Sequence, residues 1–346
     1  MSCFFKKYTL HFKLPGGTSR GVLHEKQTYI IFLQEGSKMA LGECNRFVRL
    51  SYDDRADYEQ KLYDICNRLS EEKENLLPEL REWPSIRFGV ETILKDWQNG
   101  AKQIIFPEVI QPEGFTIPTN GLVWMSEKSV MKKQIEQKLR DGYTSIKLKI
   151  GAIDFTSELE LIQYIRKQYA VDEVEIRLDA NGAFRPTEAK DKLQMLSDFG
   201  ISYIEQPIRA GQWQEMAKLC EETPIPIALD EELIGVVDPT QQSKLMDTIH
   251  PQLLILKLAL IGGFEMADRW KKLIESNGGT WVITSALESN IGLNAIAQYT
   301  ATGWSPYAQG LGTGQLYTNN FPSPYSVDAQ GLHYQNKTKW DFSLLW

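Results

Sequence analysis

The sequence predicts an α/β protein, a TIM-like (β/α)7β barrel preceded by a smaller N-terminal α+β domain. Three observations predict this fold. Short apolar strands alternate with helical runs about eight times over roughly 200 residues, which is typical of a closed parallel barrel. Five of these strands end in a charged residue. The first roughly 105 residues have a different pattern, with β-branched strands followed by two helical runs.

The N-terminal domain is expected to combine an antiparallel sheet with two helices. Residues 26–34 are β-branched and aromatic and are followed by the turn signal Glu35-Gly36, so they predict a strand. Residues 10–14 and 39–43 are its expected neighbours in the sheet. Apolar residues at helical spacing predict two helices, at 58–69 and 85–98.

The alternating pattern begins near residue 116 and predicts the barrel. The expected strands are 122–125, 145–150, 175–179, 203–205, 227–230, 253–257, 281–284 and a weaker 308–311. Glycine lies just past the end of three expected helices, as in the left-handed helix stop; these helices are 128–141, 187–199 and 264–277. The expected domains are therefore 1–110, the barrel 111–320, and a segment 321–346 that returns to the first domain.

Composition excludes several classes of function. With 38 Lys and Arg against 45 Asp and Glu, the net charge of −7 argues against a nucleic-acid partner. The longest apolar stretch, 253–261, is interrupted by Lys257 and is too short to cross a bilayer. With no signal-peptide pattern, we expect a soluble, cytoplasmic protein. The cysteines and histidines form no zinc or triad motif, so carboxylates, lysines or hydroxyls must carry any chemistry.

Five charged residues end successive barrel strands: Lys149, Asp179, Glu205, Asp230 and Lys257. Because the carboxyl ends of barrel strands converge on one mouth, we expect these side chains to meet there. The three carboxylates form an oxygen-ligand set for Mg²⁺, or for Mn²⁺, and leave open the coordination positions that a catalytic metal needs. Any one of them could equally cap a helix or pair with a lysine, but three in register favour the metal site.

Lysines in apolar strands are expected to face the barrel interior. Lys147 and Lys149 are two residues apart and share a face, whereas Lys257 enters from the opposite side. Burying Lys147 and Lys149 together with a metal ion should lower their pKa values, which makes a lysine a competent base near neutral pH. Arg177 shares a face with Asp179, and the resulting positive site would suit a dianionic small-molecule substrate.

These motifs resemble the enolase superfamily, in the muconate-cycloisomerase-like branch that carries a Lys-x-Lys motif. The matching segments are KLK at 147–149, RLDAN around Asp179, IEQP around Glu205, LDE around Asp230 and the strand of Lys257. The resemblance implies a barrel with an N-terminal capping domain. The roles it implies are metal ligands at Asp179, Glu205 and Asp230, and catalytic lysines at Lys149, Lys257 and Lys147.

Within this branch the sequence is most similar to the o-succinylbenzoate synthase family. The similarity lies in Thr18-Ser19-Arg20-Gly21, in SALESNIGLNAIAQ at 285–298 and in LGTG at 311–314. It implies that Ser19 and Arg20 belong to a mobile loop that closes over the substrate, although an ordinary hairpin is the alternative. The other implied substrate contacts are Arg177, Asn181, Ser285, Leu287 and Gly312.

The resemblance implies a dehydration that belongs to menaquinone biosynthesis. The substrate would be 2-succinyl-6-hydroxy-2,4-cyclohexadiene-1-carboxylate, bound to Mg²⁺ through its ring carboxylate. Lys149 would remove the α-proton and return it to the departing hydroxyl, while the metal and Lys257 stabilise the enediolate. The product would be 2-succinylbenzoate.

Other functions stay open at this point. Dipeptide epimerases, N-acylamino acid racemases and muconate cycloisomerases share the lysine motifs, but epimerases typically carry an Asp-x-Asp where this chain reads Gln309-Gly310-Leu311-Gly312-Thr313. A barrel glycosidase using Glu205 and Asp230 would leave the lysines unexplained. A barrel that serves only as a binding module is the third alternative. No oligomeric state is predicted.

Overall fold

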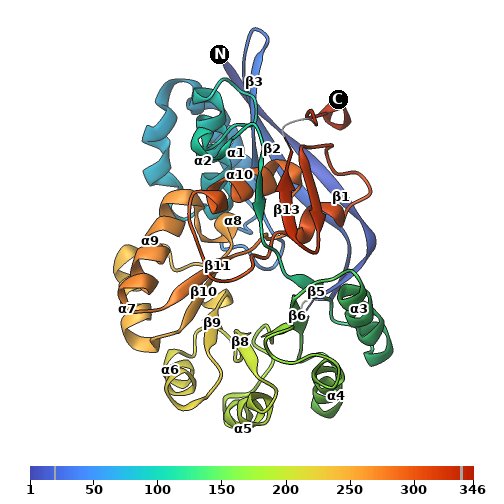
Figure 1. The fold of residues 1–346 in the computed structure, drawn as a ribbon. Coiled ribbons are helices and arrows are strands. Elements are labelled where there is room, and N and C mark those ends of the chain that lie inside the picture. Colours follow the sequence, from blue (N-terminus) through green and yellow to red (C-terminus); the bar gives the residue numbers. More distant parts are fainter. Residues whose placement is uncertain (19–20, 336–337) are drawn as a thin grey trace.

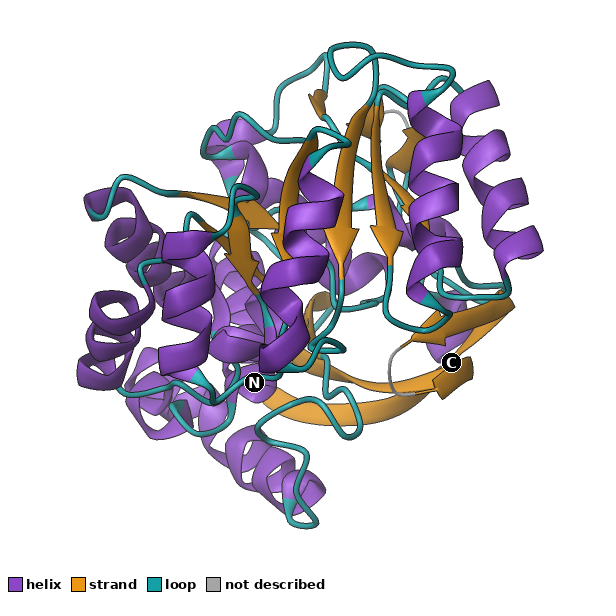
Figure 2. Ribbon diagram, turned by 90° about the horizontal axis from the view of Figure 1, so that it is seen from below, coloured by secondary structure: helices purple, strands orange, loops and turns teal. Residues whose placement is uncertain are grey.

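The structure is a computed structural model that describes residues 1–18, 21–335 and 338–346. A three-stranded antiparallel sheet with its helices lies beside a seven-stranded parallel sheet that curls into a barrel, with helices around the outside (Figure 1; Figure 2). The predicted fold class is therefore confirmed. In the part of the chain that the structure describes, no helix has both the length and the apolar character needed to cross a membrane.

A long antiparallel hairpin forms most of the N-terminal sheet. The strands pair in the order β1-β2-β3, and their bounds are β1 Ser2–Thr18, β2 Gly21–Glu35 and β3 Lys38–Cys44. The centre of β2 is buried on both faces, which explains its continuous apolar run YIIFL. Ile31 packs toward the helices of this domain, whereas Ile30 and Phe32 pack against Phe321 and Leu345 near the C-terminus.

Two predicted helices cover one face of this sheet. The helical elements are α1 Tyr58–Glu72, the 3-10 helix η1 Lys73–Leu80 and α2 Pro84–Gln98. Strand β3 and helix α2 approach closely at a pair of glycines. A Cβ added to Gly42 would lie 2.3 Å from the Gly89 carbonyl oxygen, and one added to Gly89 would lie 2.4 Å from Cys44 Sγ. Only glycine at these positions permits the observed spacing.

The barrel strands are parallel and neighbour one another in sequence order from β5 to β11. Their bounds are β5 Gly121–Val123, β6 Ser145–Lys149, β7 Glu175–Asp179, β8 Ile201–Glu205, β9 Ile227–Leu229, β10 Leu253–Leu256 and β11 Thr280–Ile283. The helices around them are α3 Lys128–Arg140, α4 Phe155–Arg166, α5 Pro186–Ser197, α6 Trp213–Glu222, α7 Pro239–Ile249, α8 Leu258–Ile261, α9 Gly263–Ser276 and α10 Asn290–Ala301.

The predicted eighth strand at 308–311 is reduced to single bridges. Gln309 pairs with Thr119, and Gly310 pairs with Thr284, which closes the barrel between β5 and β11. The Gln309 side chain accepts the Ile283 N–H at 2.7 Å, so a side chain takes a donor that a continuous ladder would have used. Backbone hydrogen bonds from Gln309 N–H to the Pro118 carbonyl and from Gly310 N–H to the Ile283 carbonyl complete the closure on both sides.

The C-terminal segment returns toward the start of the chain. Strands β12 Tyr325–Asp328 and β13 Gly331–Tyr334 form a small sheet with β4 Phe115–Ile117. The Trp346 ring then lies 5.7 Å from that of Phe32. The short 3-10 helices elsewhere are η2 Pro107–Val109, η3 Glu231–Leu233, η4 Gly312–Gln315 and η5 Ser343–Leu345. The domain boundaries at 110 and 320 stay predictions.

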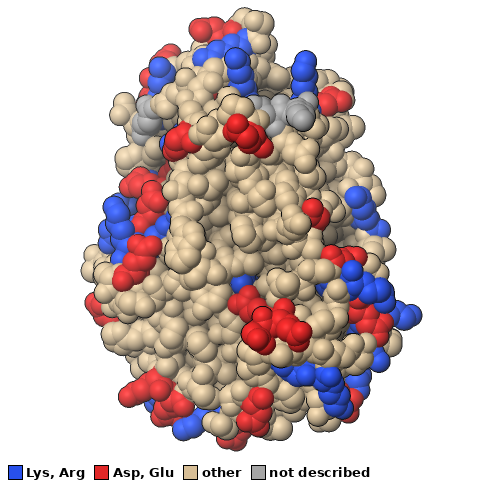
Figure 3. Space-filling view, viewed as in Figure 1, with Lys and Arg blue, Asp and Glu red and all other residues tan. Residues whose placement is uncertain are grey.

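Figure 3 shows one face of the molecule with its charged side chains. Acidic and basic groups are interspersed along the edges, and the centre of this face is largely uncharged. The charged residues that end the barrel strands, such as Asp179, Glu205 and Asp230, are instead buried at the mouth of the barrel.

Candidate active site

The strand ends bring the five predicted charged residues together at one mouth of the barrel. Lys149, Asp179 and Glu205 are the last residues of β6, β7 and β8 and are register partners across the sheet. Asp230 directly follows β9, and Lys257 directly follows β10. The three carboxylates are almost completely buried. Their mutual proximity therefore comes from the barrel itself and not from flexible loops.

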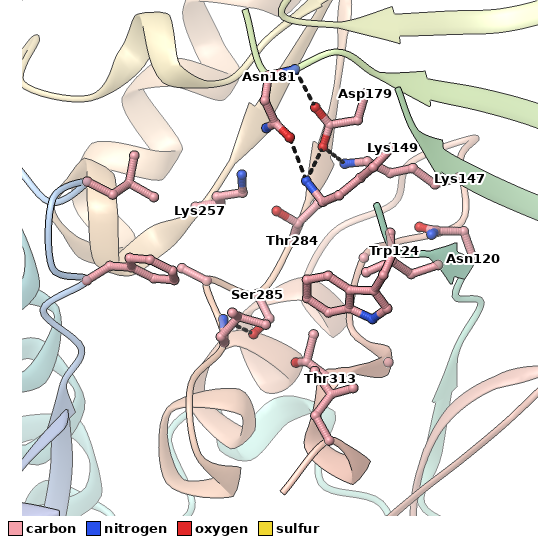
Figure 4. Close-up of a pocket in the computed structure, with 18 of the residues that line it drawn as sticks. Asn120, Trp124, Lys147, Lys149, Asp179, Asn181, Lys257, Thr284, Ser285 and Thr313 are labelled. Atoms are coloured by element: carbon pink, nitrogen blue, oxygen red, sulfur yellow. Dashed lines mark hydrogen bonds and ion pairs between the residues drawn. The ribbon is translucent and has the colours of Figure 1, made fainter. Parts of the chain in front are cut away.

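Lysine ammonium groups lie between these carboxylates. Lys149 Nζ lies 2.8 Å from Asp179 Oδ2, and Lys147 Nζ lies 3.3 Å from the same oxygen and also pairs with Glu205. Lys257 pairs with Asp230, and its Nζ lies 3.9 Å from Glu205 Oε1. Figure 4 shows Lys147 and Lys149 beside Asp179 on one side of the cavity, with Lys257 on the other side.

The carboxylates have the chemistry to hold a divalent cation. Among the described residues, no group of three His, Cys, Asp or Glu side chains has an arrangement that could hold a metal ion. Lysine ammonium groups lie between the three carboxylates and supply the positive charge there. Glu205 Oε1 is buried and accepts no hydrogen bond within the described chain. Three anionic oxygen groups, one of them with an unsatisfied acceptor, fit the ligand preference of Mg²⁺ or Mn²⁺.

Burial and charge act in opposite directions on this cluster. Burial, with repulsion from Asp179, raises the pKa of Glu205 to about 7 despite the attraction of Lys147. Burial alone would lower the pKa of Lys147, but Glu205 and Asp179 outweigh it and hold that pKa above its ordinary value. Asp230 and Glu205 do the same for Lys257. The pKa values of Lys147 and Lys257 are thus raised among the protein's own side chains, because each lies against carboxylates. The lowering predicted for Lys147 and Lys149 beside a metal ion stays a prediction.

A cavity of about 190 Å³ opens beside the cluster. Phe47 and Leu50, which follow β3, contribute to its wall from the N-terminal part of the chain. Trp124 lies across the cavity from the lysine cluster (Figure 4). Four predicted substrate contacts line it: Asn181, Ser285, Leu287 and Gly312. Two others, Ser19 and Arg20, lie outside the described residues.

The side-chain amide of Asn181 is hydrogen-bonded to Lys149 and Glu231 and not left unpaired to contact a substrate. Its Oδ1 accepts a hydrogen bond from Lys149 Nζ at 2.8 Å, and its Nδ2 donates to Glu231 Oε1 at 3.0 Å. Its backbone N–H donates to Asp179 Oδ1 at 3.0 Å. The residue has φ +44°, a left-handed conformation that asparagine tolerates. Asn181 therefore holds Lys149 in position.

Arg177 does not line the cavity, contrary to the prediction that it contacts the substrate. Its side chain is fully buried, with Nη2 donating to Glu175 Oε2 at 2.7 Å and Nη1 donating to the Ala308 carbonyl at 2.6 Å. The guanidinium also lies 5.4 Å from the Tyr203 ring centroid. Arg177 does share a face of β7 with Asp179, so it points into the barrel. It lies two residues before Asp179, however, and is therefore about 6–7 Å deeper in the barrel, measured from the mouth.

The turn after β11 carries Ser285 and Leu287, and its polar groups already have partners. Ser285 Oγ donates to Glu288 Oε2 at 2.5 Å and accepts from the Leu287 N–H at 3.0 Å. Asn45 Nδ2 donates to Glu288 Oε1 at 2.8 Å and to the Ala286 carbonyl at 3.0 Å. The Ser285 hydroxyl and the Leu287 N–H are thus engaged within the protein. Asn45 is not predicted as a site residue, because no local sequence pattern marks a contact with a residue 241 positions away.

A second buried carboxylate joins the N-terminal sheet to the barrel. Glu43 of β3 accepts hydrogen bonds from the Ser289 N–H at 3.1 Å and the Gly292 N–H at 2.9 Å, in the first turn of α10. It also accepts from the hydroxyls of Thr28 and Ser289. A carboxylate at a helix N-terminus satisfies donors that have no partner inside the helix. This cap holds the turn at 285–288 against the N-terminal sheet.

Replacing Glu43 with alanine is expected to lower the free energy of unfolding by about 2–4 kcal/mol, because buried donors would lose their acceptor. Denaturant unfolding followed by circular dichroism measures the change. Glu35→Ala, at an exposed position of β2, is the matched control and should stay within about 0.5 kcal/mol of the parent. Equal stability of the two variants would contradict a capping role for Glu43.

Comparison with known proteins assigns the family. Residues 130–334 match the model of the family described as enolase C-terminal domain-like, which is more than half of the chain. The chain belongs to this family. It is also 42% identical over 360 aligned positions to the o-succinylbenzoate synthase of Desulfotalea psychrophila, with 95% of this chain and 98% of that protein covered.

Solved structures of this family agree with the fold. The crystal structure of MenC from Desulfotalea psychrophila superposes with a TM-score of 0.84 at 38% identity, covering 96% of this chain and 99% of the other. The L-Ala-D/L-Glu epimerase from Bacillus subtilis superposes with a TM-score of 0.83 at 21% identity, covering 98% and 96%. The dipeptide epimerase from Enterococcus faecalis, solved with Mg and a dipeptide, gives 0.84 at 17%, covering 98% and 97%. The last two show the fold alone.

Two findings argue against the glycosidase alternative. The chain belongs to the enolase C-terminal domain-like family, and three lysines pair with the carboxylates.

Proposed function

We propose that this chain is an o-succinylbenzoate synthase, a hydro-lyase that converts 2-succinyl-6-hydroxy-2,4-cyclohexadiene-1-carboxylate to 2-succinylbenzoate and water. The observation that carries the proposal is the 42% identity to the Desulfotalea psychrophila enzyme over nearly the whole of both chains. Two lysines on opposite sides of a carboxylate cluster supply the chemistry that this dehydration needs. The reaction would serve menaquinone biosynthesis in the cytoplasm, and the partner is a small-molecule dicarboxylate.

Asp179, Glu205 and Asp230 would hold Mg²⁺, with Mn²⁺ as a substitute. When bound, the cation supplies positive charge that stabilises the negative charge developing on the substrate carboxylate, a contribution of several kcal/mol. Lys147 pairs with Asp179 and Glu205 and adds a positive charge beside these carboxylates. The buried setting strengthens each of these interactions relative to water.

Lys149 is the residue that moves the proton. Its Nζ takes the hydrogen α to the ring carboxylate, so the C–H bond breaks and negative charge spreads onto the carboxylate oxygens. Lys257, on the opposite side of the cavity, stabilises that charge with its ammonium group. Lys149 then gives the proton to the departing hydroxyl, the C–O bond breaks, water leaves and the ring becomes aromatic. Asn181 keeps Lys149 Nζ in place for both transfers.

The alternative within the family is racemisation or epimerisation of an amino-acid derivative by the same two lysines. An N-succinyl amino acid shares the succinyl group and is the side substrate we expect to be turned over slowly. A dipeptide carries an ammonium group, and the cavity wall at Gly312 and Thr313 offers it no carboxylate among the described residues. The epimerase activity is therefore the weaker proposal.

A substrate panel tests the proposal. The purified chain with Mg²⁺ is incubated separately with the cyclohexadiene substrate, an N-succinyl amino acid and a dipeptide. The expected result is rapid formation of 2-succinylbenzoate and slower or absent racemisation of the other two. Epimerisation of the dipeptide with no formation of 2-succinylbenzoate would overturn the assignment.

A further inference from the structure

Two buried hydroxyl groups in the cavity wall have no hydrogen-bond partner. Thr284 Oγ1 and Thr313 Oγ1 neither donate nor accept a hydrogen bond within the described chain. The two residues are only 7% and 8% exposed, and both line the cavity. Thr284 follows β11 directly, and Thr313 lies in η4. A buried hydroxyl without a partner costs free energy, so a pair of them on residues that line one cavity points to a ligand that completes them.

Neighbouring polar groups on this side of the cavity are already engaged. The Ser285 hydroxyl donates to Glu288, and the Leu287 N–H donates to Ser285. The amide of Gln309, beneath the cavity, accepts from the Ile283 N–H and donates to the Tyr307 carbonyl. Among these groups, the two threonine hydroxyls are the ones without a hydrogen-bond partner in the described chain. In the view of Figure 4, Ser285 and Thr313 lie below the lysines, and Thr284 lies between them and Lys149.

The charged residues that line the cavity indicate which chemical group of a ligand would bind these hydroxyls. The carboxylates that line the cavity are Asp179 and Glu231, and both belong to the hydrogen-bonded network around Asn181 and Lys149. No other described lining residue is acidic. The threonine hydroxyls can therefore donate to ketone or carboxylate oxygens, whereas an ammonium group beside them would find no further carboxylate among the described lining residues.

We propose that the hydroxyls of Thr284 and Thr313 donate hydrogen bonds to the succinyl side chain of the substrate and so determine specificity for it. This inference rests on the proposed function and names the contacts of that same site. The succinyl side chain carries a ketone and a carboxylate, two acceptor groups for two donors. The ring carboxylate is left for the cluster of lysines and acidic residues. The two threonines position the substrate and do not take part in proton transfer.

Thr284→Val and Thr313→Val test the proposal, because valine keeps the shape and removes the hydroxyl. With Mg²⁺ present, calorimetry measures the affinity for 2-succinylbenzoate, and steady-state kinetics measure KM and kcat. Each variant is expected to bind 2-succinylbenzoate roughly 10- to 100-fold more weakly, with a matching rise in KM and kcat within about threefold of the parent. Thr284→Ser and Thr313→Ser keep the hydroxyl and should restore the parental affinity.

Thr119→Val is the matched control. Thr119 also has a buried hydroxyl without a hydrogen bond in the described chain, but it does not line the cavity. Its replacement should leave the affinity and KM unchanged. Parental affinity in both cavity variants, or an equal loss in Thr119→Val, would overturn the specificity role. A parent protein that neither binds nor forms 2-succinylbenzoate would instead overturn the proposed function.

Discussion

Replacing Lys149 with alanine is expected to reduce kcat for the dehydration by about 10⁴-fold, the upper end of the range for a general acid–base residue. The large effect follows because one amine would serve both steps, first as base toward the α-hydrogen and then as acid toward the departing hydroxyl. Asn181 Oδ1 and Asp179 Oδ2, each 2.8 Å from Lys149 Nζ, fix that amine. Lys147 Nζ, 3.3 Å from the same Asp179 oxygen, is paired with Glu205 instead. Product formation followed by absorbance measures the loss.

Lys133→Ala is the control for this experiment, because Lys133 is exposed on α3 away from the barrel mouth. It should retain full activity. The circular-dichroism spectrum of Lys149→Ala should match that of the parent, so that a loss of activity reports chemistry and not unfolding. A kcat within tenfold of the parent in the folded variant would contradict the assignment of Lys149 as the base.

Replacing Asp179 with asparagine is expected to reduce kcat/KM by at least about 10³-fold, since a metal ion contributes several kcal/mol and each 1.36 kcal/mol is tenfold in rate. The carboxylate has a double role. Although burial opposes ionisation, Lys149 and Lys147 hold the pKa of Asp179 well below its ordinary value, so it remains an anion. Asparagine preserves the shape but removes the negative charge that a divalent cation and Lys149 both need.

Affinity for Mn²⁺, measured by electron paramagnetic resonance, separates the two roles of Asp179. We expect the affinity to fall by more than tenfold in Asp179→Asn and to stay unchanged in Asp172→Asn, where the carboxylate is exposed. Unchanged Mn²⁺ affinity together with normal turnover in Asp179→Asn would show that this carboxylate is not a metal ligand.

Much of the fold could be predicted because a barrel repeats one local pattern. Apolar strands with helices between them fix the order of the sheet, and the strand ends then have one place to converge. This is why Lys149, Asp179 and Glu205, 56 residues apart at the extremes, could be placed together from spacing alone. The eighth strand was predicted at its observed place, 308–311, but not its reduction to bridges at Gln309 and Gly310, where the Gln309 side chain takes a backbone donor.

The details of the substrate wall were beyond sequence reasoning for a physical reason. Which hydroxyls are free depends on partners supplied from distant segments. The sequence predicts Ser285 as a substrate contact, but its hydroxyl donates a hydrogen bond to Glu288, which in turn accepts one from Asn45. Thr313 lies in the LGTG motif and Thr284 directly precedes the run at 285–298, but the sequence does not show that their buried hydroxyls lack a partner. Arg177 was misplaced because period-2 alternation gives the face of a strand but not the depth in the barrel.

The central claim is that three carboxylates hold a divalent cation while two lysines approach the substrate from opposite sides. Anomalous X-ray diffraction from crystals grown with Mn²⁺ and 2-succinylbenzoate tests it directly. We predict one strong anomalous peak within ligand distance of Asp179, Glu205 and Asp230, with the aromatic ring of the product between Lys149 and Lys257. A peak elsewhere, or a product whose ring lies away from both lysines, would contradict the account.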